Sequence, residues 1–393
     1  MIITMNKTRT RFAPSPTGYM HIGNLRTALF EFLIAKHEGG DFLLRIEDTD
    51  QERKVEGAVD VIYKTLKECG LNWDEGPDIG GDFGPYVQSE RLPMYKGYAE
   101  DLIKLGGAHY CFCSEEEIEA QRKEAESLGI SFKFNDPCKH LSAEEVQAKL
   151  DAGEPYVIRQ TIKDVGETYF DDEVYGRIEV DGDVLDEQIL IKSDGYPTYN
   201  FANIIDDHQM QISHVVRGNE YLSSTPKYNL IYDAYGWQRP TYVHVPPVMK
   251  DEHHKLSKRN GDASFQDLVA KGYLPEAIMN YIALLGWAPE TEQEIYTLDE
   301  LIKVFNIHRI SKSPAIFDID KLTWMNGVYL RNMDEETYYE TVRPYLEKAV
   351  HGPYNLKEIA KIIQPRIDIL NQIEESVDFF DTLVDYDLEM YRH

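Results

Sequence analysis

The sequence predicts an α/β protein in three parts: a parallel-sheet domain, an α+β subdomain inserted into it, and an all-α C-terminal region. Strand and helix patterns alternate over residues 1–110 and again over 191–263, as in a parallel sheet that helices cover. Residues 111–190 instead combine capped helices with short alternating strands, and from residue 264 onward the apolar spacing is mostly helical. A chain of 393 residues is also too long for one ordinary hydrophobic core.

The first sheet segment begins with an expected strand at residues 8–13 and a turn rich in proline and glycine. A helix follows over residues 24–38, because apolar side chains recur there every three or four positions and Gly39-Gly40 ends the pattern. The next expected elements are a strand at 41–48, a helix at 56–70, a loop rich in Gly, Pro and Asp at 72–90, and a helix at 91–107.

The insertion begins with two helices. Ser114 and Ser142 each precede a glutamate three positions later, which is the pattern of a capping box at a helix start. Short alternating stretches at 155–162 and 177–191 indicate strands. Together these patterns predict an α+β subdomain over residues 111–190.

The second sheet segment and the C-terminal region follow. Residues 191–263 return to the alternation of helix and strand, and end with a strand at 241–249 and a charged loop. Beyond them, helical patterns predict two further regions, 264–330 and 331–393.

The composition limits the class of protein. A hydrophobic content of 42% and a charged content of 28% are typical of globular domains, and no run of about 18 apolar residues indicates a membrane-spanning helix. The N-terminal residues lack a secretory signal, and four cysteines are too few for a disulfide scaffold, so a cytoplasmic protein without a membrane partner is expected. The net charge of −28 argues against a nucleic-acid partner, unless a local basic groove offsets it.

The stretch RFAPSPTGYMHIGN joins the first expected strand to the first helix. His21 and Gly23 stand at the helix start, where unpaired backbone N–H groups favour phosphate and a glycine lets a ligand approach closely. A histidine there would donate to a phosphoryl oxygen. The alternative is an ordinary helix start, and on this stretch alone the two interpretations are balanced.

A second motif, KLSKR at residues 255–259, follows a strand and precedes the turn signal Asn260-Gly261. Alone, this motif fits a solvated basic turn. Paired with His21, it would place cations at a strand end of the same parallel sheet, where ligands of such sheets bind. Together the two motifs would clamp a triphosphate.

These residues carry a resemblance. His21-Ile22-Gly23-Asn24 resembles the HIGH signature of class I aminoacyl-tRNA synthetases, and Lys255-Leu256-Ser257-Lys258-Arg259 resembles their KMSKS signature. The stretches RFAPSPTG, LRIEDTDQER, SDGYPTYNFANIIDDH and HVVRGNEYLSSTPK are similar to the bacterial-type glutamyl-tRNA synthetases, and the similarity runs from about residue 9 to the end of the sequence.

The resemblance implies a role for each predicted part. The sheet domain would be a Rossmann-like catalytic domain in two halves, 1–110 and 191–263. Residues 111–190 would bind the acceptor end of tRNA, 264–330 would form a helical stem-contact domain, and 331–393 would be a partial helical anticodon-binding region. Residues 331–393 would form only part of the anticodon-binding region, because the resembled family usually continues with a further helical subdomain.

The activity implied by the resemblance is ATP-dependent ligation of L-glutamate to tRNA-Glu by a monomer, through a glutamyl-adenylate, with release of AMP and pyrophosphate. The glutamate carboxylate already carries the attacking charge, so the site must supply orientation and positive charge rather than a general base. His21 and Lys258 would be catalytic. Mg²⁺ would accompany the triphosphate, and ATP would contact His21, Gly23, Asn24, Lys255, Ser257, Lys258 and Arg259.

Glutamate carries two carboxylates and one ammonium, so a selective site needs two cations and one anion. By resemblance, Arg11 and Arg217 would meet the carboxylates, since a planar guanidinium binds both oxygens, and Glu47 would meet the ammonium. The other matching positions are Ala13, Ser15, Tyr199 and Asn203. Without the resemblance, each of these residues fits an ordinary strand end, turn or surface position.

Three of the four cysteines lie close together in the sequence, as Cys111-Phe112-Cys113 and Cys138-Lys139-His140. Cys and His at paired short spacings can form a closed zinc site, although C-x-C is less typical than C-x-x-C and clustered reduced thiols are the alternative. Some members of the resembled family carry zinc here with C-x-C followed by C-x-H. The resemblance therefore favours a structural Zn²⁺ on Cys111, Cys113, Cys138 and His140.

Other functions stay open at this point. A close variant of the activity would also charge tRNA-Gln, and a shorter relative that modifies a tRNA base would lack the all-α region. A nucleotidyltransferase acting on a small metabolite would share the His-x-Gly helix start but would need neither the insertion nor the helical tail. An inactive RNA-binding relative is the fourth alternative, and the presence of His21 and Lys258 argues against it.

Overall fold

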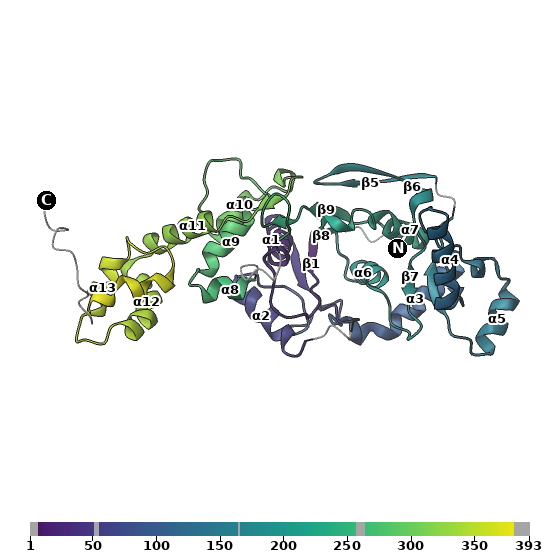
Figure 1. Cartoon of the computed structure of the whole chain (residues 1–393), viewed down its shortest axis with the longest axis horizontal. Helices are drawn as coiled ribbons and strands as arrows, with labels where there is room; N and C mark the ends of the chain where they lie inside the picture. Colours follow the sequence, from purple (N-terminus) through teal and green to yellow (C-terminus); the bar gives the residue numbers. More distant parts are fainter. Residues whose placement is uncertain (1–6, 51–54, 164–165, 257–263, 381–393) are drawn as a thin grey trace.

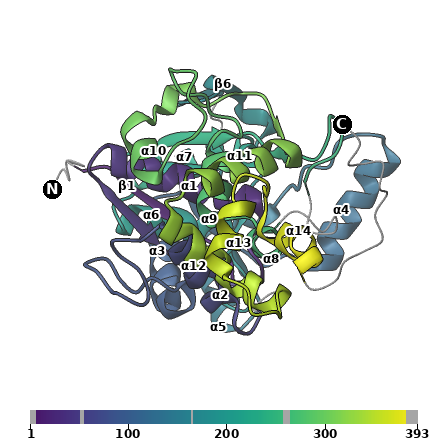
Figure 2. The same ribbon diagram turned by 90° about the vertical axis from the view of Figure 1, so that its left-hand side faces the viewer.

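The computed structural model describes residues 7–50, 55–163, 166–256 and 264–380, which form an elongated molecule (Figure 1). The parallel strands lie in the middle, the inserted helices at one end, and the C-terminal helices at the other. Figure 2 looks along the long axis from the helical end and shows α12 (Glu335–Ala349) and α13 (Leu356–Ile363) in front of the sheet domain. The three predicted parts are therefore arranged in a row.

The two sheet segments form one unit. Strand β1 (Arg9–Phe12) pairs in parallel with β2 (Asp41–Leu44), and β8 (His214–Gly218) pairs in parallel with β9 (Thr241–Val245). The backbone N–H of Ser213, just before β8, donates to the carbonyl oxygen of Arg9 at 3.0 Å. Residues 204 positions apart are therefore neighbours, which confirms the prediction of a parallel-sheet domain interrupted by an insertion.

Helix α1 (Ile22–His37) is the central helix of the molecule. It packs against β1, β2 and β8 on one side and against α9 (Pro275–Ala283) and α10 (Leu298–Val304) on the other. Because it is enclosed from several directions, eleven of its sixteen residues are buried, more than a single apolar face would require. The remaining helices of the sheet domain are α2 (Ala58–Glu68), α3 (Leu92–Lys104), α6 (Tyr199–Gln209) and α7 (Thr225–Tyr235).

The insertion contains an antiparallel sheet and two short helices. Its strands are β3 (Ala108–Cys111), β4 (Val157–Gln160) and β7 (Ile189–Ile191). Helices α4 (Glu115–Ser127) and α5 (Ala143–Asp151) both begin with complete capping boxes, at Ser114 with Glu117 and at Ser142 with Glu145. The two predicted helix starts are therefore confirmed.

The hairpin β5 (Glu167–Asp172) and β6 (Gly176–Asp181) departs from the expectation for 111–190. Asp172 lies opposite Tyr242 in a parallel pairing with β9, so this hairpin extends the sheet of the second segment. The residues lie inside the predicted insertion along the sequence, but in space they continue the central domain. Long-range strand pairing of this kind leaves no local sequence signal.

The C-terminal region is helical except for one short strand. Its elements are α8 (Phe265–Ala270), α9, α10, β11 (Ala315–Ile316), α11 (Ile319–Asn332), α12, α13 and α14 (Ile373–Ser376). β11 pairs in parallel with β10 (Val248–Met249) and ties this region to the sheet domain. Phe265 and Trp287 share an apolar core with α1, whereas α12 and α13 pack in a separate core. Among the described residues, none of the helices combines the length and apolar character needed to cross a membrane.

Candidate active site

A cavity of about 500 Å³ opens at the carboxyl ends of β1 and β8. Its walls come from the turn after β1, the first turns of α1, the loop after β2, the start of α6 and the segment that follows β8. Parallel sheets bind their ligands at this edge, because loops from several strands converge there. The predicted residues that line it are Arg11, Ala13, Ser15, Asn24, Glu47, Tyr199 and Arg217.

Arg217, near the end of β8, is a cation of this cavity that has no acidic partner within the part of the chain that the structure describes. Its guanidinium is buried and donates from Nε to His244 Nε2 at 3.3 Å and from Nη2 to Thr225 Oγ1 at 3.0 Å. It lies 4.8 Å from the centre of the Tyr228 ring and 5.2 Å from that of Tyr221, close enough for cation–π attraction. Among the described residues, no carboxylate lies within 4 Å of it. The geometry therefore leaves a buried positive charge for an anionic ligand.

His244, on β9, holds Arg217 in place. Its Nδ1 lies 2.6 Å from Asp172 Oδ2, and a carboxylate only accepts, so Nδ1 carries the proton. Nε2 is then free of a proton and accepts from Arg217. Burial lowers the pKa of His244 despite the hydrogen bond that it donates to Asp172, which agrees with a neutral ring. The sequence prediction missed this chain of contacts because its members come from separate strands.

Arg11, near the end of β1, differs from Arg217 in being paired with two carboxylates. Its Nε and Nη2 donate to Asp207 at 2.8 and 3.1 Å, and Nη1 donates to Glu31 at 3.1 Å. Burial would raise the pKa of Asp207, but the charges of Arg11 and Arg45 outweigh it and lower that pKa. Burial raises the pKa of Glu31 well above its usual value, against the opposing charge of Arg11. Asp207 is therefore the main counter-ion of Arg11.

Glu47, in the loop after β2, is one of the acidic groups that line the cavity. Its Oε1 accepts from Arg45 Nη2 at 3.0 Å, and burial raises its pKa although Arg45 and Arg11 oppose the shift. The centres of the Tyr199 and Tyr221 rings lie 5.4 Å apart, with the ring planes tilted by 42°. Burial first, and then the charge of Glu47, raise the pKa of Tyr199 well above its usual value. Tyr199 therefore stays a hydrogen-bond donor.

Asn203, also predicted for this site, lies one turn further along α6. Its side chain is buried and donates from Nδ2 to the carbonyl oxygen of Tyr199 at 2.6 Å. It is not among the residues that line the cavity. In this structure Asn203 stabilises the first turn of α6, which carries Tyr199.

His21 connects the two motifs of the sequence. As the N-cap of α1, its Nδ1 accepts from the backbone N–H of Gly23 at 3.0 Å, so the proton resides on Nε2. Nε2 donates to the carbonyl oxygen of Leu256 at 3.0 Å, within the KLSKR motif. A Cβ at position 23 would lie 3.2 Å from His21 Nδ1, so a larger residue there would push the imidazole by a few tenths of an ångström.

Of the KLSKR motif, the structure describes Lys255 and Leu256. Lys255 is exposed and forms an isolated bridge with Met249, while Asn24 is exposed at the cavity rim. Ser264 pairs with His21 in a second bridge, so both flanks of residues 257–263 reach the start of α1. The predicted Ser257, Lys258 and Arg259 lie outside the described residues. The predicted meeting of the two motifs is nevertheless seen at Leu256.

The three clustered cysteines lie together in space, with one change from the predicted set. The Sγ atoms of Cys111, Cys113 and Cys138 and a carboxylate oxygen of Asp136 lie within 4.8 Å of one another. His140 does not belong to this group and is exposed. Asp136 caps the short 3-10 helix Pro137–His140, which contains both Cys138 and His140.

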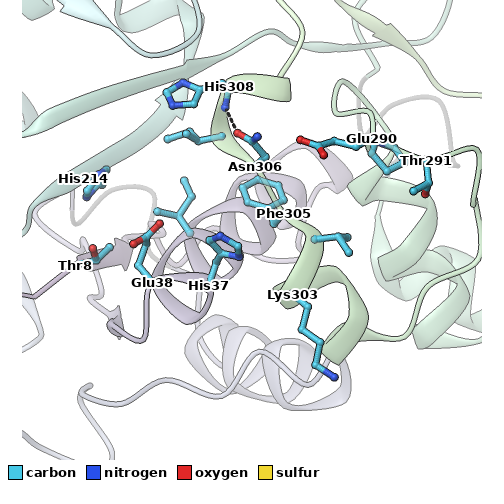
Figure 3. A pocket seen from close by; sticks show the side chains of 14 residues that line it. Thr8, His37, Glu38, His214, Glu290, Thr291, Lys303, Phe305, Asn306 and His308 are labelled. Atoms are coloured by element: carbon cyan, nitrogen blue, oxygen red, sulfur yellow. Dashed lines mark hydrogen bonds between the residues drawn. The ribbon is translucent and has the colours of Figure 1, made fainter.

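A second, larger cavity of about 780 Å³ lies at the amino ends of the same strands (Figure 3). Thr8 and His214 precede or begin β1 and β8, and the end of α1 and residues Lys303 and His308 form the other walls. None of the predicted site residues lines this cavity, and its walls carry both acidic and basic side chains. We therefore place the candidate active site at the carboxyl ends of the strands.

Comparison with known proteins agrees with this placement. A family model described as tRNA synthetases class I (E and Q), catalytic domain, matches residues 7–324. The glutamate–tRNA ligases of Clostridium botulinum strain Hall and Clostridium tetani are 60% and 59% identical to this chain over 388 residues, which cover 99% of this chain and 80% of each relative.

Solved structures give the same result for the fold. A glutamate–tRNA ligase from Elizabethkingia meningosepticum, solved in complex with its amino acid, superimposes with a TM-score of 0.92 at 36% identity. That match covers 98% of this chain and 83% of the other. A glutamate–tRNA synthetase from Elizabethkingia anophelis gives 0.91 at 37% identity, over 98% and 84% of the two chains. Motifs, site geometry and these matches lead to one conclusion: the chain belongs to the class I tRNA synthetases for glutamate and glutamine.

Proposed function

We propose that this chain is a glutamate–tRNA ligase, which activates L-glutamate with ATP and transfers it to tRNA-Glu, releasing AMP and pyrophosphate. The single observation that carries this proposal is Arg217, a buried cation without an acidic partner among the described residues, in a polar cavity at the carboxyl ends of parallel strands. A ligand with a carboxylate would provide the missing counter-ion of Arg217. Relatives at about 60% identity carry the name of this activity.

The charges of the cavity are those that a glutamate molecule requires. Arg217 would bind one carboxylate, and Glu47 would accept from the ammonium group. Arg11 would attract the second carboxylate once Glu31 is neutral, leaving Asp207 as its remaining counter-ion. A glutamine side chain would bring no negative charge to the arginine that meets the second carboxylate, and sites that recognise a polar partner discriminate by up to roughly 10⁴–10⁵.

ATP would bind beside the glutamate, at the N-terminus of α1. The backbone N–H groups of the first turn and the partial positive charge of the helix favour a triphosphate, and Asn24 lies at the rim between the two positions. His21 and Lys255 would contact ATP, together with Ser257, Lys258 and Arg259. Mg²⁺ would enter with ATP. The attacking carboxylate needs no general base, so the rate enhancement would come from orientation of the reactants and from positive charge on the phosphates.

The other parts of the chain would bind tRNA. We assign the acceptor end to residues 111–190, the stem to 264–330 and part of the anticodon arm to 331–393, as the resemblance implies. Hairpin β5–β6 is an exception, since it extends the sheet of the catalytic domain. We propose a monomer that works in the cytoplasm.

A structural zinc ion would stabilise the start of the insertion. Thiolate sulfur is a preferred zinc ligand, and the Sγ atoms of Cys113 and Cys138 lie 3.6 Å apart. Bound there, zinc would tie the end of β3 to the segment around Cys138. The donor atoms fit this ion, and we assign it no part in the chemical steps.

The test of the proposed function is a charging assay with labelled L-glutamate on transcripts of tRNA-Glu, tRNA-Gln and tRNA-Asp. We expect ATP-dependent charging of tRNA-Glu and none of tRNA-Asp. Charging of tRNA-Gln as well would identify an enzyme that does not discriminate between the two acceptors. Formation of a glutamyl-adenylate without transfer to any tRNA would contradict the proposal.

A further inference from the structure

Arg26, on α1, is a buried arginine whose charge is not neutralised by a carboxylate. Its side chain is 2% exposed, and within the described part of the chain no carboxylate lies within 4 Å of it. Nη1 donates to the carbonyl oxygen of Leu285 at 2.8 Å, and Nη2 donates to that of Pro246. Burial lowers the pKa of Arg26 to about 10, against a smaller opposing effect of Tyr175. A buried charge without a counter-ion destabilises a fold, so an apolar side chain would suit this position better if Arg26 only filled space.

The guanidinium of Arg26 points away from the glutamate cavity. The residues of α1 that line that cavity are Asn24, Thr27 and Glu31. Arg26 instead reaches the residue that follows β9 and the turn that follows α9. This turn approaches closely, since a Cβ on Gly286 would lie 3.3 Å from Arg26 Nη1. Arg26 therefore joins α1 to two segments that are distant in the sequence.

Pro246 lies at the base of a hairpin that leads into the KLSKR motif. The first strand of this hairpin is β10 (Val248–Met249), and the second ends at Leu256. The backbone N–H of Leu256 donates to the carbonyl oxygen of Val248 at 3.1 Å, and Lys255 forms a bridge with Met249. We call these residues the 248–256 hairpin.

Helix α1 holds the 248–256 hairpin near both of its ends. His21 donates from Nε2 to the carbonyl oxygen of Leu256, the last residue of the hairpin, at 3.0 Å. Arg26, five positions further along the helix, donates to Pro246, two positions before the first. The sequence continues from Leu256 into Ser257-Lys258-Arg259, the proposed ATP contacts. The hairpin that precedes these contacts is thus attached to the helix whose N-terminus would bind the triphosphate.

We infer that Arg26 is a positioning residue for the activation of glutamate by ATP, because it holds the base of the 248–256 hairpin against α1. This inference rests on the proposed function. Arg26 would touch neither substrate, and would act through the KLSKR motif that the hairpin leads into. Arginine suits this role because its planar fork presents N–H groups in fixed directions to two carbonyl oxygens, which a single ammonium group does not do.

Hydrogen exchange of the full-length protein tests the hold on the hairpin without an assay of activity. Arg26→Met keeps a long unbranched side chain but removes the donors. Backbone amides of residues 248–256 should then exchange about 10–150-fold faster than in the parent, as expected for loss of a charged hydrogen bond. Parental protection of the hairpin in this variant would overturn the inference.

Arg9→Met is the matched control. Arg9 is a buried arginine at the amino end of β1, and it also holds a backbone carbonyl, since its Nε donates to that of Met210 at 3.0 Å. Its loss should leave the protection of the 248–256 hairpin parental. Equal acceleration in the two variants would show a general loss of stability and would overturn a specific role for Arg26.

Glutamate-dependent exchange of pyrophosphate into ATP, measured with tRNA-Glu present, gives an independent answer. In Arg26→Met the kcat/KM for ATP should fall by up to about 100-fold, because a displacement of about 1 Å far from the reacting atoms can cost that much. The KM for glutamate should stay parental, since Arg217 keeps its contacts. Unchanged kinetics for ATP, or an equal rise in the KM values for ATP and glutamate, would overturn the inference.

Arg26→Lys keeps the test decisive if methionine at this buried position prevents folding. Lysine retains a charge and a donor but loses the fork that spans both carbonyl oxygens, so the kcat/KM for ATP should still fall by about 10-fold. Parental kinetics for ATP in the lysine variant would overturn the inference. The two proposals fail separately. A parent that charges tRNA-Glu while Arg26→Met keeps a parental hairpin refutes this inference alone, whereas faster hairpin exchange in a protein that charges no tRNA refutes the proposed function alone.

Discussion

The imidazole Nε2 of His21 donates to the carbonyl oxygen of Leu256 at 3.0 Å, although the two residues are 235 positions apart in the sequence. This contact joins the N-terminus of α1 to the KLSKR motif. It requires the neutral ring with its proton on Nε2, because Nδ1 caps the helix by accepting from Gly23. One side chain thus both caps the start of α1 and contacts the backbone of Leu256.

Replacement of His21 by alanine should affect activation far more than stability. The lost cap should cost about 0.5–2 kcal/mol of unfolding free energy. Glutamate-dependent exchange of pyrophosphate into ATP, measured with tRNA-Glu present, should fall by at least about 100-fold, as expected for loss of a group that contacts the reacting phosphates. Ser114→Ala is the matched control, since it removes a helix cap in the insertion. Equal losses of exchange in the two variants would exclude a specific role for His21.

Replacement of Arg217 by glutamine should raise the KM for glutamate. Losing a charge-assisted bond costs about 1.5–3 kcal/mol, which corresponds to about 10–150-fold. The KM for ATP should change little. Arg239→Gln is the control, because Arg239 is an arginine at the surface that pairs with Asp233. The assignment fails if both variants saturate with glutamate like the parent.

His244 should act on glutamate through Arg217. His244→Leu removes the acceptor for Arg217 Nε, so we expect a higher KM for glutamate at a nearly unchanged kcat with saturating glutamate. His244→Gln keeps an acceptor for Arg217 and a donor for Asp172, and should recover most of the affinity. If the glutamine variant is as impaired as the leucine variant, the histidine has only a packing role.

The carboxyl of Glu31 should make stability depend on pH. Burial raises its pKa in the folded protein well above the usual value, so the native state keeps a proton that the unfolded state has released. Between those two pKa values stability falls as pH rises. Glu31→Gln lacks this titration, and its stability relative to the parent should therefore increase as pH rises above the ordinary glutamate pKa. Urea midpoints of both proteins at several pH values measure this; a constant difference would show that Glu31 does not titrate there.

Sequence patterns predicted the elements that depend on neighbouring residues. The capping boxes at Ser114 and Ser142 start helices as expected, and the apolar period at residues 24–38 marks α1. Cys69, at the end of α2, is buried, and burial raises the pKa of its thiol. The pairing of β5 with β9 was not predictable, because it depends on contacts between distant segments.

In the candidate site, too, local motifs could be recognised in the sequence, whereas contacts between distant segments could not. The resemblance named Glu47 and Arg217, and both line the cavity at the carboxyl ends of the strands, while His21 begins α1 beside it. The partners of Arg11 were not foreseen, because Asp207 is 196 positions away and reaches it through the packing of α6. Asp136 was missed because spacing rules count cysteines and histidines, whereas the backbone turn decides which side chain faces the thiols.

The central claim is that one glutamate molecule binds at the carboxyl ends of β1 and β8 with a carboxylate on Arg217. A crystal structure of the protein soaked with L-glutamate tests this most directly. We predict a ligand carboxylate oxygen within about 3 Å of the Arg217 guanidinium and the ammonium group facing Glu47. Glutamate found instead in the cavity at the amino ends of the strands, between His214 and His308, would contradict the account.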